Sequence, residues 1–176
     1  MFGFFRKRRW QKPAEGLYLS LVAQSRQEQF YVGDGVPDTV DGRFDMICLH
    51  AFLVLRRLKA EQTPDAAELA QAVFDLMFQD MDRNLREMGV GDLSVGKHIK
   101  GMAKALYGRI AAYEEGVTVT EPGPLADALT RNLYRGTEPD PAQIDRMSSY
   151  VRAQAAALAD QPIGELIAGK VSFRAR

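Results

Sequence analysis

The stretch FDMICLHAFLVLRRL, residues 44–58, decides the fold class of this chain. Its apolar residues recur at the spacing of an α-helix. The predicted core stripe consists of Phe44, Ile47, Ala51, Val54 and Leu58. Because further apolar residues surround that stripe on nearly every side, we expect a central, buried helix over about residues 42–59. The preceding VPDTVDGRF turn offers side-chain oxygens that can cap the start of this helix.

Helical spacing continues outward from this stretch in both directions, and strand signals are scarce. One helix is predicted before it, over residues 15–31, and ends at a pair of glycines. Proline, glycine and capping residues delimit the predicted later helices, which cover about residues 64–88, 93–115, 124–135 and 141–159, with a short helix after Pro162. The pattern predicts an all-α, compact single-domain bundle of about six to seven helices. We expect residues 1–13 to form a separate N-terminal segment and residues 14–176 to form the helical domain.

Length and composition fit one ordinary globular domain. The chain has 176 residues, of which 46% are hydrophobic and 26% charged, and its 23 basic residues balance 23 acidic ones. The longest apolar run, Met46–Leu55, is too short to span a bilayer, which needs about 20 apolar residues. Cys48 is the only cysteine, so no intrachain disulfide can form.

The sequence offers no constellation that is typical of an enzyme or a metal site. Neither His50 nor His98 follows a glutamate by three residues, as in di-metal helical bundles. His50 could be a ligand, but a packed core histidine bonded to a carbonyl is the interpretation we favour. No glycine-rich phosphate loop and no nucleophile elbow is present. We therefore predict no catalytic residues, no metal and no cofactor.

Two features of the predicted helix over residues 93–115 point to a partner. Lys97, Lys100 and Lys104 share one face, which would suit phosphate, an acidic protein or RNA, although an ordinary solvated face is an equal alternative. Gly101 and Gly108 are unusual in a helix interior, where glycine costs about 1 kcal/mol relative to alanine. Their missing side chains could allow another helix to approach closely, from this chain or from a partner.

Aromatic residues bracket a basic cluster at the N-terminus. The segment that we predict to contact a membrane consists of Phe2, Phe4, Phe5, Arg6, Lys7, Arg8, Arg9 and Trp10. Aromatic rings partition into the headgroup region of a bilayer, and basic residues are attracted to anionic lipids. A disordered basic tail, or one that binds RNA, remains the alternative.

Three stretches of the chain are similar to one known family. These are FYVGDGVPDTVDGRFDMICLHAFLVLRRL (residues 30–58), MFQDMDRNLREMGVGDLSVGKHIKGMAKALYGR (77–109) and RNLYRG (131–136). They resemble the ubiquinol–cytochrome c chaperone family, whose members assist assembly of the cytochrome bc1 complex (complex III). The likeness covers about residues 17–151. Without a long presequence, the chain looks like an alphaproteobacterial member of the family.

The resemblance implies an assembly chaperone that binds newly made cytochrome b or bc1 assembly intermediates. It also implies possible contact with the ribosome, and no specific contact with DNA. A bacterial member would be cytoplasmic and peripheral to the inner membrane; a eukaryotic one would work on the matrix side of the mitochondrial inner membrane. The family supplies no catalytic residues, so the resemblance too implies a protein that is not an enzyme.

Physical reasoning must choose the residues that face the partner. The segment MDRNLREMGVGDLSVGK joins two predicted helices with polar residues and glycines, as functional loops often do. We predict that the partner-facing residues are Asp80, Asp82, Arg86, Asp92, Lys97, Lys100 and Lys104. A methionine-rich groove could hold an apolar client, because methionine side chains adapt to irregular surfaces. Its candidate residues are Met77, Met81, Met88 and Met102, although core packing explains them equally well.

Two alternatives belong to other classes of function. One is a helical protein or enzyme that binds a small molecule or lipid in a pocket beside His50 and Tyr107. The other is a factor that binds the ribosome or RNA through the lysine face and the N-terminal cluster. Such a factor would show binding that weakens steeply with salt.

Overall fold

In the computed structural model of the chain, the backbone is described for residues 2–175 and the side chains for residues 9–175. Within these limits the structure is all-helical, as predicted, and contains no strand. The helices are α1 (Phe2–Ser25), α2 (Glu28–Val32), α3 (Val40–Ala60), α4 (Pro64–Glu87), α5 (Asp92–Thr118), α6 (Pro122–Asn132), α7 (Pro141–Asp160) and α8 (Ile163–Ile167). The prediction of a compact single-domain bundle is confirmed, with α2 and α8 as short additions to six longer helices.

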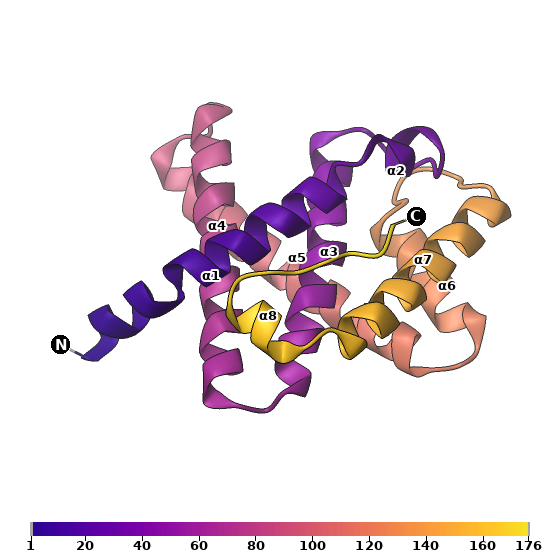
Figure 1. Cartoon of the computed structure of the whole chain (residues 1–176). Helices are drawn as coiled ribbons and strands as arrows, with labels where there is room; N and C mark the ends of the chain where they lie inside the picture. Colours follow the sequence, from indigo (N-terminus) through magenta and orange to yellow (C-terminus); the bar gives the residue numbers. More distant parts are fainter. Residues whose placement is uncertain (1, 176) are drawn as a thin grey trace.

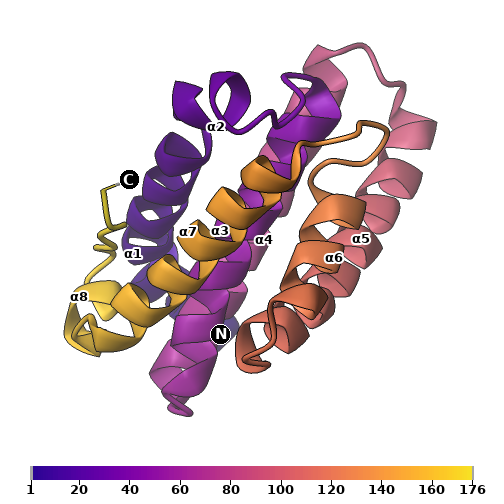
Figure 2. The same ribbon diagram turned by 90° about the vertical axis from the view of Figure 1, so that its right-hand side faces the viewer.

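Helix α3 lies at the centre of the bundle, as the apolar stretch predicted (Figures 1 and 2). It packs against α1, α4, α5 and α7. The side chain of Thr39 accepts a hydrogen bond from the backbone N–H of Gly42 at 3.0 Å, so the turn before α3 does cap this helix.

The buried side chains form two core clusters on opposite sides of α3. The first cluster joins α3 to α1 and α4, through side chains such as Leu17, Val54 and Leu69. The second cluster joins α3 to α5, α6 and α7, and it includes Phe52 and Tyr113. A helix that is buried on both sides must be apolar around most of its circumference, which explains the composition of α3.

The first helix differs from the prediction in both of its boundaries. It continues through Pro13, so the expected boundary after residue 13 lies inside α1, and it stops at Ser25, before the short helix α2. A proline inside a helix removes one backbone hydrogen bond. The buried side chains of Trp10, Ala14 and Leu17 continue one apolar stripe across Pro13, and packing of this stripe on the core compensates for the lost bond.

The segment after α8 starts against α1, passes in front of α3 and ends beside α7 (Figure 1). Gly169 adopts a left-handed backbone conformation, with φ of 82°, and lies directly against Pro13 and Gly16. Farther along, the side chain of Gln154 on α7 bonds the backbone of Arg174 twice, at 2.7 and 2.8 Å. We call residues 169–174 the C-terminal strap, because they tie α1 to α7.

Candidate partner-binding site

A buried carboxylate links three separate parts of the bundle. Asp45, on the first turns of α3, has no exposed surface. Its Oδ1 accepts a hydrogen bond at 2.6 Å from Nη2 of Arg109 on α5, and its Oδ2 accepts one at 2.9 Å from Nε of Arg135, just beyond α6. A second guanidinium nitrogen of Arg135 lies 3.3 Å from a carboxylate oxygen of Asp41. These four residues form a charged cluster that is electrically neutral as a whole.

Burial and charge act on Asp45 in opposite directions. Burial raises the pKa of its carboxyl group, and the positive charges of Arg109 and Arg135 lower it, which offsets part of that rise. The side chain of Arg109 is almost fully buried, and its Nε has no hydrogen-bond partner among the described residues. Each buried charge therefore depends on its neighbours in the cluster, since an unpaired charge in a protein interior is strongly unfavourable.

The charged cluster forms one side of a cleft of about 560 Å³ between the start of α3, the end of α4 and the first half of α5. Apolar side chains such as Phe44, Leu85 and Met102 line the rest of the cleft, together with exposed Lys97 and His98. We call it the charged cleft.

The predicted partner-facing residues fall into two groups. The acidic residues and Arg86 are engaged within the chain: Asp80 accepts a hydrogen bond from the hydroxyl group of Tyr18 at 2.7 Å, and Arg86 forms ion pairs with both Asp82 and Asp92. The three lysines, by contrast, are exposed on α5, and no ion pair is found for them among the described residues. They are Lys97, Lys100 and Lys104. The predicted lysine face therefore exists, while the acidic residues mainly hold α4 to α1 and α5.

Gly101 and Gly108 lie on the open side of α5. A methyl group added to either glycine would meet no described atom within 4 Å. Of the two explanations that the sequence left open, close approach of a helix from this chain is therefore wrong for both positions.

Three comparisons with known proteins bear on the whole chain. The sequence model of the family described as ubiquinol-cytochrome C chaperone matches residues 34–173. The chain belongs to this family. It is 31% identical over 160 residues to ubiquinol-cytochrome c reductase complex assembly factor 1 of Mus musculus, an alignment that covers 90% of this chain and 53% of the mouse protein. It is 29% identical over 147 residues to the mitochondrial protein CBP3 of Saccharomyces cerevisiae, covering 82% and 44% of the two chains.

The similarity extends to a solved structure. The crystal structure of the Cbp3 homolog from Brucella abortus matches with a TM-score of 0.85 and 35% sequence identity, over 99% of this chain and 96% of that one. The chain thus spans about half the length of the curated relatives that it matches, but nearly all of the bacterial homolog.

The charged cleft gathers all three stretches that resemble the ubiquinol-cytochrome C chaperone family. Asp45 lies in the first stretch, Arg109 in the second and Arg135 in the third. Sequence reasoning did not single out these residues. The available signal was an acid at the edge of a continuous apolar run, because an aspartate in a buried helix needs a cationic partner.

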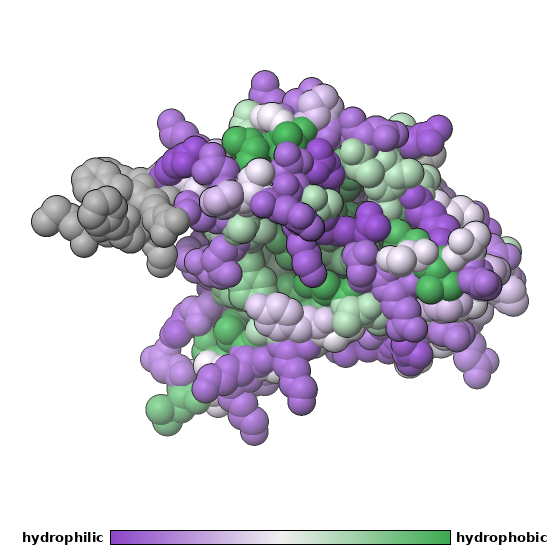
Figure 3. Space-filling view, turned by 90° about the horizontal axis from the view of Figure 1, so that it is seen from below, coloured by the Kyte–Doolittle hydropathy of each residue, from purple (hydrophilic) through white to green (hydrophobic). Residues whose placement is uncertain are grey.

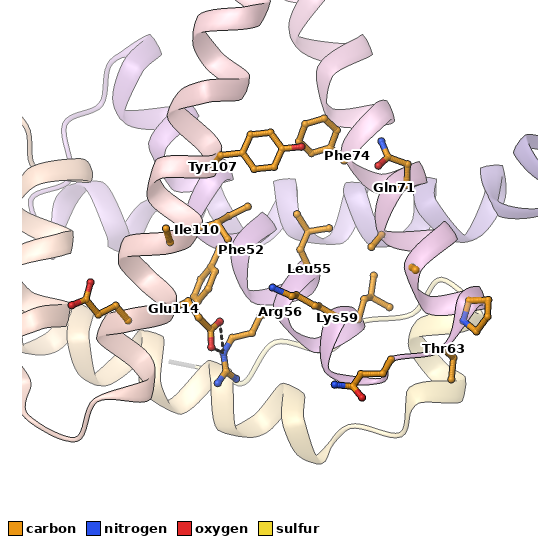
Figure 4. Close-up of a pocket in the computed structure, with 17 residues that line it drawn as sticks. Phe52, Leu55, Arg56, Lys59, Thr63, Gln71, Phe74, Tyr107, Ile110 and Glu114 are labelled. Atoms are coloured by element: carbon orange, nitrogen blue, oxygen red, sulfur yellow. Dashed lines mark hydrogen bonds and ion pairs between the residues drawn. The ribbon is translucent and has the colours of Figure 1, made fainter.

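The other half of the same three-helix layer contains an apolar groove that sequence reasoning also missed. It has a volume of about 860 Å³, and α3, α4 and α5 form its walls. Leu55, Phe74 and Ile110 line it, and small residues such as Ala67 and Ala111 leave its space empty. Figure 4 shows these walls, and Figure 3 shows apolar surface between hydrophilic margins on the lower side of the molecule.

His50 lies in the core and not beside this groove. Its Nδ1 lies 2.9 Å from the carbonyl oxygen of Met46 and its Nε2 lies 2.8 Å from the hydroxyl group of Tyr150, so the predicted bond to a carbonyl is confirmed. Phe30 and Phe173 pack edge-on against the imidazole ring. Tyr107 is 60% exposed and lines the apolar groove, so the pocket expected beside both residues is wrong. Burial lowers the pKa of His50 to about 4.

The predicted membrane-contacting segment is described only in its last two side chains. Trp10 is 3% exposed, and its indole N–H donates to a carboxylate oxygen of Glu68 at 3.0 Å. Arg9 stacks over the Trp10 ring and pairs with Asp65. Trp10 thus faces the core and not the surroundings of the protein, because it belongs to the buried stripe of α1. The side chains of Phe2, Phe4, Phe5, Arg6, Lys7 and Arg8 lie outside the described residues.

The residues that the structure describes lack both a metal-binding cluster and a membrane-spanning helix. No group of three or more histidine, cysteine, aspartate or glutamate side chains among them could hold a metal ion. None of the helices that they form combines the length and the apolar character needed to cross a bilayer.

Proposed function

We propose that this chain is an assembly chaperone for ubiquinol–cytochrome c reductase that binds newly made cytochrome b. The observation that carries the proposal is membership of the ubiquinol-cytochrome C chaperone family over residues 34–173. The similar mouse and human proteins are named as assembly factors of this complex, which supports the proposal.

The proposed mechanism is binding without catalysis. A membrane protein that has not yet assembled exposes apolar helices, and these aggregate unless another surface covers them. This chain offers the apolar groove, whose volume no described side chain fills, and an exposed lysine face on α5. The chaperone would hold the client until its partner subunits and haem groups replace the contact. We place it on the cytoplasmic side of the bacterial inner membrane, or on the matrix side in mitochondria.

The lysine face supports a further contact with the ribosome during synthesis of the client. Lys97, Lys100 and Lys104 are exposed, and their charges are free to meet phosphate groups of RNA. If RNA binding were the main function, purified protein would bind ribosomes in a strongly salt-dependent manner and would capture no cytochrome b.

A crosslinking pull-down of the tagged chain from growing cells tests the proposal. Cytochrome b should be enriched among the captured proteins, and a strain that lacks the cytochrome b gene provides the matched control. A deletion strain should lose assembled bc1 complex. Normal bc1 levels in that strain would contradict the proposed function.

A further inference from the structure

Side-chain contacts brace the apolar groove at both of its ends. At one end the rings of Phe74 and Tyr107 pack together, with 5.5 Å between their centroids, and join α4 to α5. At the other end Arg56 donates a hydrogen bond to Glu114 at 3.0 Å and joins α3 to α5 (Figure 4). These contacts hold the three walls in place, so the groove is formed in advance and does not depend on an occupant.

The dimensions of the groove suit a short helix. Its wall on α4 runs over residues 64–74 and its wall on α5 over residues 107–115. At a rise of about 1.5 Å per residue, these walls are about 12 to 15 Å long, or two to three helical turns. A bound helix that places side chains i, i+3, i+4 and i+7 in a groove needs about this length.

The margins of the groove carry charges of both signs. Lys59 on α3 and Glu115 on α5 are exposed, and no ion pair is found for either among the described residues. The anionic headgroup of a lipid or fatty acid would complement Lys59, but it would offer no positive charge to Glu115. A helix with an acidic and a basic side chain flanking its apolar face complements both.

The glycines on the open side of α5 extend the surface that such a helix would cover. Gly108 follows Tyr107 directly, and Ala111 is both exposed and part of the groove wall. Because no atom of the described residues lies within 4 Å of a methyl group placed on Gly101 or Gly108, the backbone of a second helix can approach α5 closely there.

We propose that the apolar groove is the client site, and that it takes two to three turns of an amphipathic helix of the client polypeptide. The apolar face of that helix lies on Leu55, Phe74 and Ile110, an acidic side chain points toward Lys59 and a basic one toward Glu115. This inference rests on the proposed function, since the client is the one named there.

Site-directed photocrosslinking in cells that make cytochrome b tests this assignment. A photoreactive phenylalanine analogue replaces Ala67 or Ala111 in the groove and, as a control, exposed Ala156 on α7. The two groove positions should yield a cytochrome b adduct, and position 156 should not. Adducts from position 156 alone would overturn the groove assignment while the proposed function stands. A lipid adduct in place of cytochrome b at the groove positions would also overturn it.

Charged substitutions in the groove provide a second test. Ala67→Glu and Ala111→Lys should each lower the amount of co-purified cytochrome b by about tenfold, because an unpaired charge against apolar surface is costly. Ala156→Glu should leave it unchanged, and thermal unfolding followed by circular dichroism checks that all three variants fold. Undiminished cytochrome b in both groove variants would overturn the site. Loss of cytochrome b from the unsubstituted protein as well would instead overturn the proposed function.

Discussion

The charged cleft and the apolar groove lie at opposite ends of one layer made of α3, α4 and α5, yet they use their residues in different ways. In the charged cleft, Asp45 is matched by Arg109 and Arg135, so its strongest interactions are already made within the chain. In the apolar groove, alanines such as Ala67 and Ala111 leave a volume that the part of the chain described by the structure does not fill. The residues with the most conspicuous chemistry therefore stabilise the fold, while inconspicuous small residues leave room for a partner.

Removing the centre of the charged cluster should have the largest effect. Asp45→Ala leaves Arg109 buried without a counter-charge, and we expect the free energy of unfolding to fall by about 3–5 kcal/mol in urea titrations. Asp41→Ala is the control, because Asp41 is largely exposed and its pair with Arg135 is worth about 1 kcal/mol or less. Equal losses of unfolding free energy for the two variants would mean that the buried carboxylate of Asp45 does not stabilise the fold more than the exposed one of Asp41.

A pH titration should reveal the next largest effect, which comes from His50, a buried residue of α3. Burial lowers the pKa of His50 to about 4 in the folded protein, against 6.5 for an exposed histidine. Between these values the unfolded chain takes up a proton that the folded chain does not, so stability is lost as the pH falls. The loss should reach about 3 kcal/mol near pH 4, since each pKa unit corresponds to about 1.36 kcal/mol.

The substitution His50→Gln isolates this contribution. Urea unfolding at pH 7 and at pH 4.5 should show a smaller acid loss for the variant than for the original chain, while their stabilities should run parallel above pH 7. Parallel curves over the whole range would contradict the assignment of a neutral, buried His50.

A pair of glycines on α5 compares a filled surface with an open one. A methyl group on Gly116 would lie 2.7 Å from the Cα atom of Leu125 on α6, so Gly116→Ala should lower the free energy of unfolding by about 1–3 kcal/mol. The methyl group of Gly108→Ala would meet no described atom within 4 Å, and this substitution should raise the free energy of unfolding by about 0.5–1 kcal/mol, because alanine favours the helix. Thermal unfolding of the two variants measures both changes in stability. If Gly108→Ala is destabilising, the open face of α5 is not as free as the structure indicates.

Periodicity predicted the helices well because the apolar stripe of each predicted helix is, in most cases, the face that the helix buries in the core. The predicted helix over residues 42–59 and α3 agree to within two residues at each end. The predicted start of the first helix at residue 15 was wrong, because Pro13 is a strong local stop signal. Only the tertiary packing of Trp10 and Ala14 explains why the helix continues through this proline.

The candidate sites were harder to predict because they depend on contacts between distant residues. Asp45 and Arg135 are 90 positions apart, and nothing local in either segment identifies the other as its partner. The lysine face was predictable, because it depends on the spacing within one helix. The apolar groove was not predictable, because a groove is an unfilled space between three helices and depends on how these helices pack.

The C-terminal strap has a consequence for how the chain is made. Gly169 lies against Gly16 on α1, and Phe173 packs against the ring of His50, so the strap, which is synthesised after the helices, completes the packing of α1 and α3. Contacts of such long sequence separation slow folding, because the intervening chain must be ordered before they form. While the ribosome still holds residues 169–174, the contacts of the strap with Gly16, His50 and Gln154 cannot form, and the bundle can close only after the strap has been translated.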